Sequence, residues 1–140
     1  MYLVAIMDLH SRYLVGWSLS NTMETQWVVN TLREAVERYG APEIINSDQG
    51  SQFTSDAYIE YVKSLEKTRI SMDGKGRATD NAFIERFFRT LKYDKIYLEV
   101  HHEGHELERS CQQFINYYNH KREHSGLGYK PPKTRYKFVA

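Results

Sequence analysis

The first half of this 140-residue chain alternates strand-like and helix-like hydrophobic patterns in an order that strongly limits its fold. Residues 2–7 and 13–19 are apolar segments separated by a short polar turn, which predicts a β-hairpin. Beyond the hairpin, the spacing of apolar residues predicts a helix over 22–39, a strand over 43–48, a helix over 56–65 and a strand over 68–72. Thr22 is the expected N-cap of the first helix and Gly40 its end. This order of elements is typical of an α/β sheet flanked by helices.

The second half predicts two further helices, over 79–93 and about 103–119, and a polar, irregular tail from Lys121. A composition with 41% hydrophobic and 26% charged residues favours one folded domain. We expect a core over about 1–100 and a C-terminal helix with a basic tail over about 101–140. The sequence has no apolar stretch of the roughly 20 residues that cross a bilayer, and its single cysteine cannot form an internal disulfide. These features predict a cytoplasmic protein with no membrane partner.

The charge of the chain changes sign within the sequence. Residues 1–85 contain 8 Lys and Arg against 12 Asp and Glu, whereas residues 86–140 contain 11 against 6. The basic half therefore begins directly after Glu85, which suits a polyanion held beside bound metal ions. Ordinary solvated surface charge is the alternative interpretation.

Two acidic residues, Asp48 and Glu85, are the strongest candidates for chemistry. Asp48 ends a predicted strand, the usual place for a site in an open α/β sheet, and Glu85 lies in the first turns of a predicted helix. On that helix, the 3.6-residue period places Asn81, Arg89 and Lys92 on the same face as Glu85. Carboxylates that bind divalent metal, next to cations that bind phosphate, suit phosphoryl transfer. An amphipathic surface helix would show the same spacing, and its apolar stripe of Phe83, Phe87 and Leu91 is expected to pack on the sheet.

Three motifs, at consistent spacing along the chain, point to one family. They are SDQGSQFTS at 47–55, DNAFIERF at 80–87, and YYN at 117–119 followed by Arg122, His124 and LGYKP at 127–131. Together they resemble the integrase core of bacterial insertion-sequence transposases, which are relatives of retroviral integrases. The resemblance implies an RNase H-like fold, a mixed sheet flanked by helices. It also implies an Asp-Asp-Glu triad that holds two Mg²⁺ (or Mn²⁺) ions, and the cleavage and joining of DNA strands.

The resemblance assigns roles to individual residues. Asp48 matches the second triad member and Glu85 the third, so both are expected catalytic residues and metal ligands. Arg89 and Lys92 match helix positions that contact DNA in the retroviral relatives, and Asn81 matches a polar position one turn before the glutamate. The remaining expected DNA-binding residues are Lys121, Arg122 and His124. The expected partners are transposon-end DNA, target DNA and further copies of the chain.

The first triad Asp has no match in these 140 residues. In the family it lies on a strand before the one that matches residues 2–7, so we expect a fold that lacks its usual first, central strand. Metal binding and catalysis should then be weak, and the exposed strand edges favour oligomerisation. Asp8 is expected to stabilise the hairpin turn. The alternatives are an inactive transposase remnant that only binds DNA or dimerises, and an RNase H-like nuclease.

Overall fold

The computed structural model describes residues 1–47, 51–72 and 82–136, and it divides the chain into two compact units. Unit 1 contains residues 1–6 and the described part of 16–82, and unit 2 contains residues 7–15 and 83–136. The described strands form two sheets of two strands each, β1 with β2 and β3 with β4. Within the described ranges, no helix is long and apolar enough to cross a membrane.

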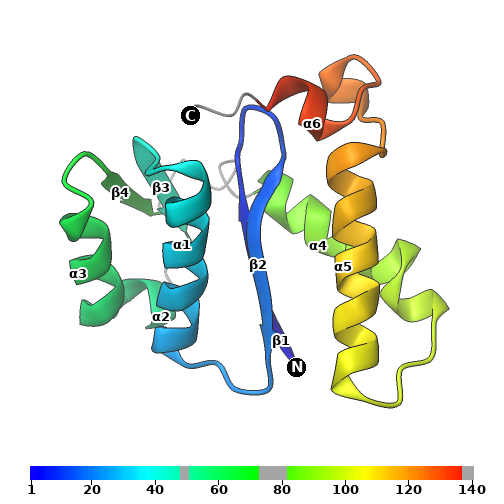
Figure 1. Ribbon diagram of the computed structural model, residues 1–140, viewed down its shortest axis with the longest axis horizontal. Helices are drawn as coiled ribbons and strands as arrows, with labels where there is room; N and C mark the ends of the chain where they lie inside the picture. Colours follow the sequence, from blue (N-terminus) through cyan, green and yellow to red (C-terminus); the bar gives the residue numbers. More distant parts are fainter. Residues whose placement is uncertain (48–50, 73–81, 137–140) are drawn as a thin grey trace. The chain divides into compact units, whose positions relative to one another are not determined.

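The predicted hairpin is present, with β1 at Tyr2–Met7 and β2 at Leu14–Ser20 (Figure 1). Its turn closes through backbone hydrogen bonds from Asp8 N to Tyr13 O (2.9 Å) and from Arg12 N to Asp8 O (2.6 Å). The Asp8 carboxylate accepts hydrogen bonds from the backbone N of Ser11 (3.0 Å) and from the Ser11 hydroxyl. The predicted structural role of Asp8 is therefore confirmed, because its carboxylate is bonded within the turn.

Helix α1 spans Thr25–Tyr39 and ends, as predicted, at Gly40, whose positive φ of 94° suits a residue without a side chain. Its start differs from the prediction. The N-cap is Glu24 rather than Thr22, and its side chain makes no capping hydrogen bond. The backbone N of Thr22 instead donates to the Ser20 hydroxyl (3.1 Å), a local bond that holds these residues outside the helix.

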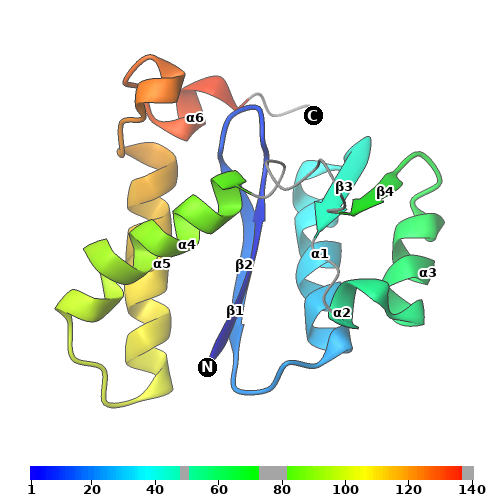
Figure 2. The ribbon, with the colours of Figure 1, turned by 180° about the vertical axis from the view of Figure 1, so that it is seen from behind.

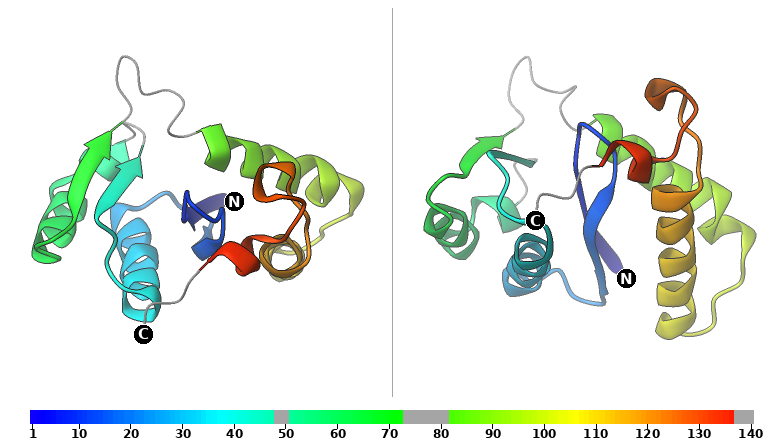
Figure 3. Two further views of the ribbon diagram at one scale, coloured as in Figure 1. Left: turned by 90° about the horizontal axis from the view of Figure 1, so that it is seen from above. Right: turned by 45° about the horizontal axis from the view of Figure 1, so that its top comes forward.

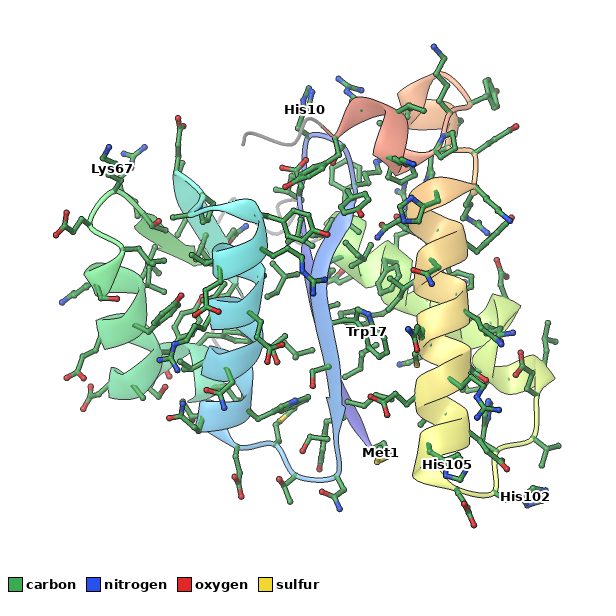
Figure 4. All side chains as sticks on the ribbon, viewed as in Figure 1. Met1, His10, Trp17, Lys67, His102 and His105 are labelled. Atoms are coloured by element: carbon green, nitrogen blue, oxygen red, sulfur yellow. The ribbon has the colours of Figure 1, made fainter. Side chains whose placement is uncertain are left out.

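Strands β3 (Ile44–Ser47) and β4 (Arg69–Met72) are parallel, with Ile44 opposite Arg69 and Ser47 opposite Met72. Between them lie the short helix α2 (Ser51–Thr54) and helix α3 (Asp56–Ser64). Ser55 is the N-cap of α3, and its hydroxyl accepts a hydrogen bond from the backbone N of Tyr58 (3.4 Å). Lys67 lies in the turn that leads from α3 into β4 (Figure 4).

The core of unit 1 forms where α1 and α3 face each other. Partly buried side chains of β1, β3 and β4, among them Val4 and Ile45, pack against it. Gly16 in β2 lets the strand approach α1 closely, because an added Cβ would lie 3.1 Å from the Cβ of Ala35. The buried residues of this core are Val28, Val29, Leu32, Tyr58 and Val62.

Unit 2 contains two long helices, α4 (Ala82–Asp94) and α5 (Gly104–His120), and α4 crosses α5 (Figure 2). Three short elements accompany them: η2 at Ile96–Leu98, η3 at Ser125–Leu127 and α6 at Pro132–Arg135. The segment with η3 and α6 lies at the C-terminal end of α5 (Figure 3). The tail from Lys121 was predicted to be irregular, and that prediction is wrong for η3 and α6. Pro132 starts α6, because its fixed φ suits the first turn of a helix.

The core of unit 2 is aromatic. The ring of Phe87, which is 1% exposed, lies 5.0 Å from the Tyr118 ring and 6.3 Å from the Phe114 ring, both on α5. The apolar stripe of α4 therefore packs against α5 through Phe87, a partner that the sequence did not predict. Cys111 and Ile115 are also buried on α5.

Hairpin residues 7–15 are anchored to α5 within unit 2. The side-chain Oδ1 of Asn119 accepts a hydrogen bond from Leu14 N (2.8 Å), and its Nδ2 donates to Leu14 O (3.1 Å). Both residues are buried. At the turn, labelled in Figure 4 by His10, the Nε of Arg135 donates to the His10 Nε2 (3.3 Å).

Candidate metal site and nucleic-acid interface

Of the two predicted triad residues, Glu85 is the one that lies within the described residues. It lies in the first turn of α4 and is exposed, and no hydrogen bond or ion pair joins it to another residue of the described ranges. The aromatic stripe of the helix fixes this orientation, because burying Phe87 and Leu91 turns Glu85 toward solvent. A carboxylate in the first turn also interacts favourably with the helix dipole. Within the described part of the chain, the Glu85 carboxylate thus faces solvent without a protein partner.

Asp48 and Asn81 lie outside the described residues. The structure places the strand that leads to Asp48, because β3 ends at Ser47. The side-chain amide of Asn46, two residues before Asp48, is buried, and neither its oxygen nor its nitrogen has a hydrogen-bond partner among the residues described. The described residues contain no group of three or more His, Cys, Asp or Glu that could hold a metal ion.

The predicted DNA-binding residues Arg89 and Lys92 are exposed on α4. Arg89 lines an open hollow of about 370 Å³, which Thr90, Tyr93, Asp94 and Arg122 also line. The Arg89 guanidinium lies 5.9 Å from the centre of the Tyr93 ring, and Arg122 pairs with Asp94 at 3.2 Å. The fold thus brings Arg122 beside Arg89, although 33 positions separate them in the sequence.

Lys121 and His124 have different surroundings. Lys121 is exposed and forms no ion pair with the described residues. His124 is half-buried, with its ring 4.7 Å from the Tyr118 ring. Burial first, and then the nearby Arg12 and Arg122, lower the pKa of His124 from 6.5 to about 4. The imidazole is therefore neutral near pH 7, so it would contact DNA as a hydrogen-bonding group and not as a cation.

His124 should also make the stability of the protein depend on pH. Its pKa is lower in the folded chain than in the unfolded chain, so the unfolded state binds more protons between about pH 6.5 and about pH 4. The associated stability is present above pH 6.5 and is lost as the pH falls toward 4. We expect His124→Gln to reduce this loss, measured as the thermal midpoint across that range. His120→Gln, which changes an exposed histidine nearby, is the control and should keep the wild-type profile.

Sequence reasoning missed two cationic residues near the predicted ones. Arg12, in the hairpin turn, and Arg86, on α4, line a second and smaller cavity together with Arg122 and His124. No sequence signal could have linked Arg12 to the others, because the hairpin turn and α4 are distant in the chain. Arg86 follows Glu85 directly, so the change from net acidic to net basic sequence after Glu85 could have pointed to it.

Comparison with known proteins identifies the family. Two family models, both described as an integrase core domain, match residues 1–78 and 66–132. The chain belongs to the integrase core domain family. This integrase core is 38% identical over 142 residues to the transposase for insertion sequence element IS904 of Lactococcus lactis subsp. lactis (strain IL1403), covering 99% of the chain and 55% of that relative. It is 36% identical over 139 residues to transposase InsF for insertion sequence IS3A of Escherichia coli (strain K12), covering 95% of the chain and 47% of that relative.

The integrase core thus spans about half the length of the curated relatives it matches. Among solved structures, it is similar to the HTLV-2 integrase catalytic core domain in complex with magnesium. The dimeric form of that domain matches with a TM-score of 0.72 and 19% identity, covering 95% of the chain and 82% of the other. The trimeric form matches with a TM-score of 0.75 and 18% identity, covering 96% and 84%. These matches confirm the predicted mixed α/β, RNase H-like fold.

Proposed function

We propose that this chain is the catalytic core of a transposase, which cuts transposon-end DNA and joins its 3′-hydroxyl to target DNA. One observation carries the proposal. In an integrase core fold, the exposed carboxylate of Glu85 shares helix α4 with the exposed cations Arg89 and Lys92. A metal-binding carboxylate next to phosphate-binding cations is what strand cleavage at phosphorus requires.

Asp48 and Glu85 would hold Mg²⁺ or Mn²⁺. The HTLV-2 integrase core was solved in complex with magnesium, which supports the choice of metal. Carboxylate oxygens are ligands of hard divalent cations. When bound, such ions polarise the phosphoryl oxygens and activate the attacking hydroxyl or water. In this proposal, Arg89, Lys92 and Lys121 bind the phosphates of the DNA backbone, and Arg122 contributes from the hollow beside Arg89.

We further propose that the Asp-Asp-Glu triad of this chain lacks its first Asp. Only two carboxylates of these 140 residues match it, so metal affinity and cleavage by this chain alone should be weak. We expect little Mg²⁺-dependent cleavage of transposon-end DNA, measured on labelled oligonucleotides. Robust cleavage that is lost in both Asp48→Asn and Glu85→Gln would contradict the impairment and show that the two residues suffice. Cleavage that survives both substitutions would contradict their assignment as metal ligands.

DNA binding is a separate test, because an inactive remnant would also bind. Affinity for duplex DNA should fall steeply with salt as phosphate-bound counterions are released. Replacing both Arg89 and Lys92 with Gln should reduce the slope of log affinity against log salt by about 2, since each phosphate contact contributes about 0.9. Lys63→Gln, an exposed lysine on α3, is the control and should keep the slope. An unchanged slope in the double variant would contradict the assignment of α4.

The relatives favour a transposase over an RNase H-like nuclease, because the Lactococcus lactis and Escherichia coli relatives are both named as transposases. The HTLV-2 core was solved in dimeric and trimeric forms, which supports our expectation of a homo-oligomer here.

A further inference from the structure

Three arginines of unit 2 converge on one small cavity. Arg12 comes from the hairpin turn, Arg86 from α4 and Arg122 from the segment after α5. The cavity has a volume of about 60 Å³, room for a few water molecules or one small oxyanion. No acidic residue lines it within the described ranges. Its other lining residues are Phe83, Phe87, Thr90, Tyr118 and His124.

Contacts other than ion pairs hold two of these arginines in place. The Arg12 guanidinium lies 4.5 Å, and that of Arg86 6.0 Å, from the centre of the same Phe83 ring. Both cations thus lie against one aromatic ring, an interaction that does not itself occupy their N–H donors. Gly126 admits the Arg12 side chain, because a Cβ at that position would clash with the Arg12 guanidinium.

Among the described residues, one arginine of this cluster has an acidic partner. Arg122 pairs with Asp94, which lines the neighbouring hollow and not this cavity. Like charges held close together repel, and they repel more strongly beside buried side chains such as Phe87 and Tyr118 than in water. An arrangement of this kind is costly when empty and is stabilised by an anion.

One residue that lines the cavity also has an unsatisfied ring nitrogen. The Nε2 of His124 is buried and makes no hydrogen bond within the described part of the chain. Such a buried polar atom costs free energy unless a ligand or water satisfies it. The lining therefore contains three arginines and a histidine whose hydrogen-bonding capacity is not fully used within the described residues.

We infer that this cavity is a binding site for a phosphate group of the DNA backbone. Guanidinium groups bind phosphate oxygens through paired N–H donors, and several of them can share the oxygens of one tetrahedral group. The cavity shares Arg122 and Thr90 with the hollow that Arg89 lines, so a strand held by Arg89 can place a further phosphate here. This inference rests on the proposed DNA-binding function and extends it from the exposed face of α4 to Arg12 and Arg86.

The first experiment uses inorganic phosphate as the probe and does not depend on DNA. The full chain is melted in phosphate and in chloride of equal ionic strength, as wild type, Arg86→Gln and Arg109→Gln. Arg86 is exposed, so the Arg86→Gln variant should fold. In chloride, its thermal midpoint should equal or exceed that of the wild type, because repulsion among the arginines falls. Phosphate should raise the midpoint of the wild type and of Arg109→Gln, an exposed arginine on α5, but not that of Arg86→Gln. An equal rise in all three proteins would reflect general salting-out and overturn the inference.

The second experiment asks whether DNA supplies the phosphate. We expect Arg86→Gln to weaken binding of duplex DNA about tenfold or more and to reduce its salt slope by about 1. If phosphate stabilises the wild type but Arg86→Gln keeps full DNA affinity, the cavity binds an adventitious ion only, and the inference is overturned. The Arg89 and Lys92 double variant separates the two proposals. If the double variant loses DNA binding and Arg86→Gln keeps it, the proposed function stands and only this phosphate site is refuted.

Discussion

Replacing Phe87 with Ala is expected to destabilise the folded chain by about 3–5 kcal/mol, the range found when a buried aromatic side chain is removed. Phe87 is 1% exposed and contacts the rings of Phe114 and Tyr118, so the change removes the centre of the unit 2 core and leaves a cavity. Because α4 is held on α5 by this core, the position of Glu85 should be lost with it. Urea denaturation of the two proteins gives the difference directly.

Tyr93→Ala is the matched control, because it removes an aromatic side chain from the same helix at a position that is 60% exposed. Its effect should stay within about 0.5 kcal/mol. A loss below about 1 kcal/mol for Phe87→Ala would show that α4 does not depend on this core. If the wild type is less stable than the expected loss, the variant will be unfolded in buffer, which far-UV circular dichroism detects.

Asn119→Ala is expected to cost about 2–4 kcal/mol, although it removes little apolar surface. The substitution leaves both backbone groups of Leu14 buried without partners, and each unsatisfied group costs about 1–3 kcal/mol. The wild-type side chain satisfies both at once, at 2.8 and 3.1 Å. The free energy of unfolding in urea is the measurement.

Asn116→Ala provides the comparison for Asn119→Ala, because Asn116 is exposed on the same helix, one turn earlier. It should change stability by only a few tenths of a kcal/mol, the difference in helix propensity. Equal effects of the two substitutions would mean that the Leu14 contact does not hold the hairpin turn to α5.

The sequence predicted the long elements well, because they depend on local hydrophobic periodicity. Helix α5 shows why: Cys111, Phe114, Ile115 and Tyr118 recur at helical spacing, and all four are buried. Short elements lack enough residues for a period, so α2, η2, η3 and α6 were not predicted. The start of α1 was misplaced because Thr22 is a good N-cap by type, yet it bonds to Ser20 instead.

The candidate site was predictable only in part. Glu85, Arg89 and Lys92 lie on one helix, so their shared face follows from helical geometry. The contact of Phe87 with α5 was not predicted, because periodicity identifies a buried face but not the element that covers it. The arginine cavity depends on tertiary contacts between the hairpin turn, α4 and the segment after α5, which no local pattern encodes.

The distribution of Trp and Cys gives the two units separate spectroscopic and chemical reporters. Both tryptophans, Trp17 and Trp27, lie in unit 1, whereas the single cysteine, Cys111, lies in unit 2. Cys111 is 2% exposed, and burial, with a smaller effect of Glu108, raises the pKa of its thiol to about 11. Alkylating reagents therefore meet an unreactive thiol until unit 2 opens. Labelling kinetics and tryptophan fluorescence, recorded in one sample, would reveal whether the two halves of this integrase core melt as a single cooperative body.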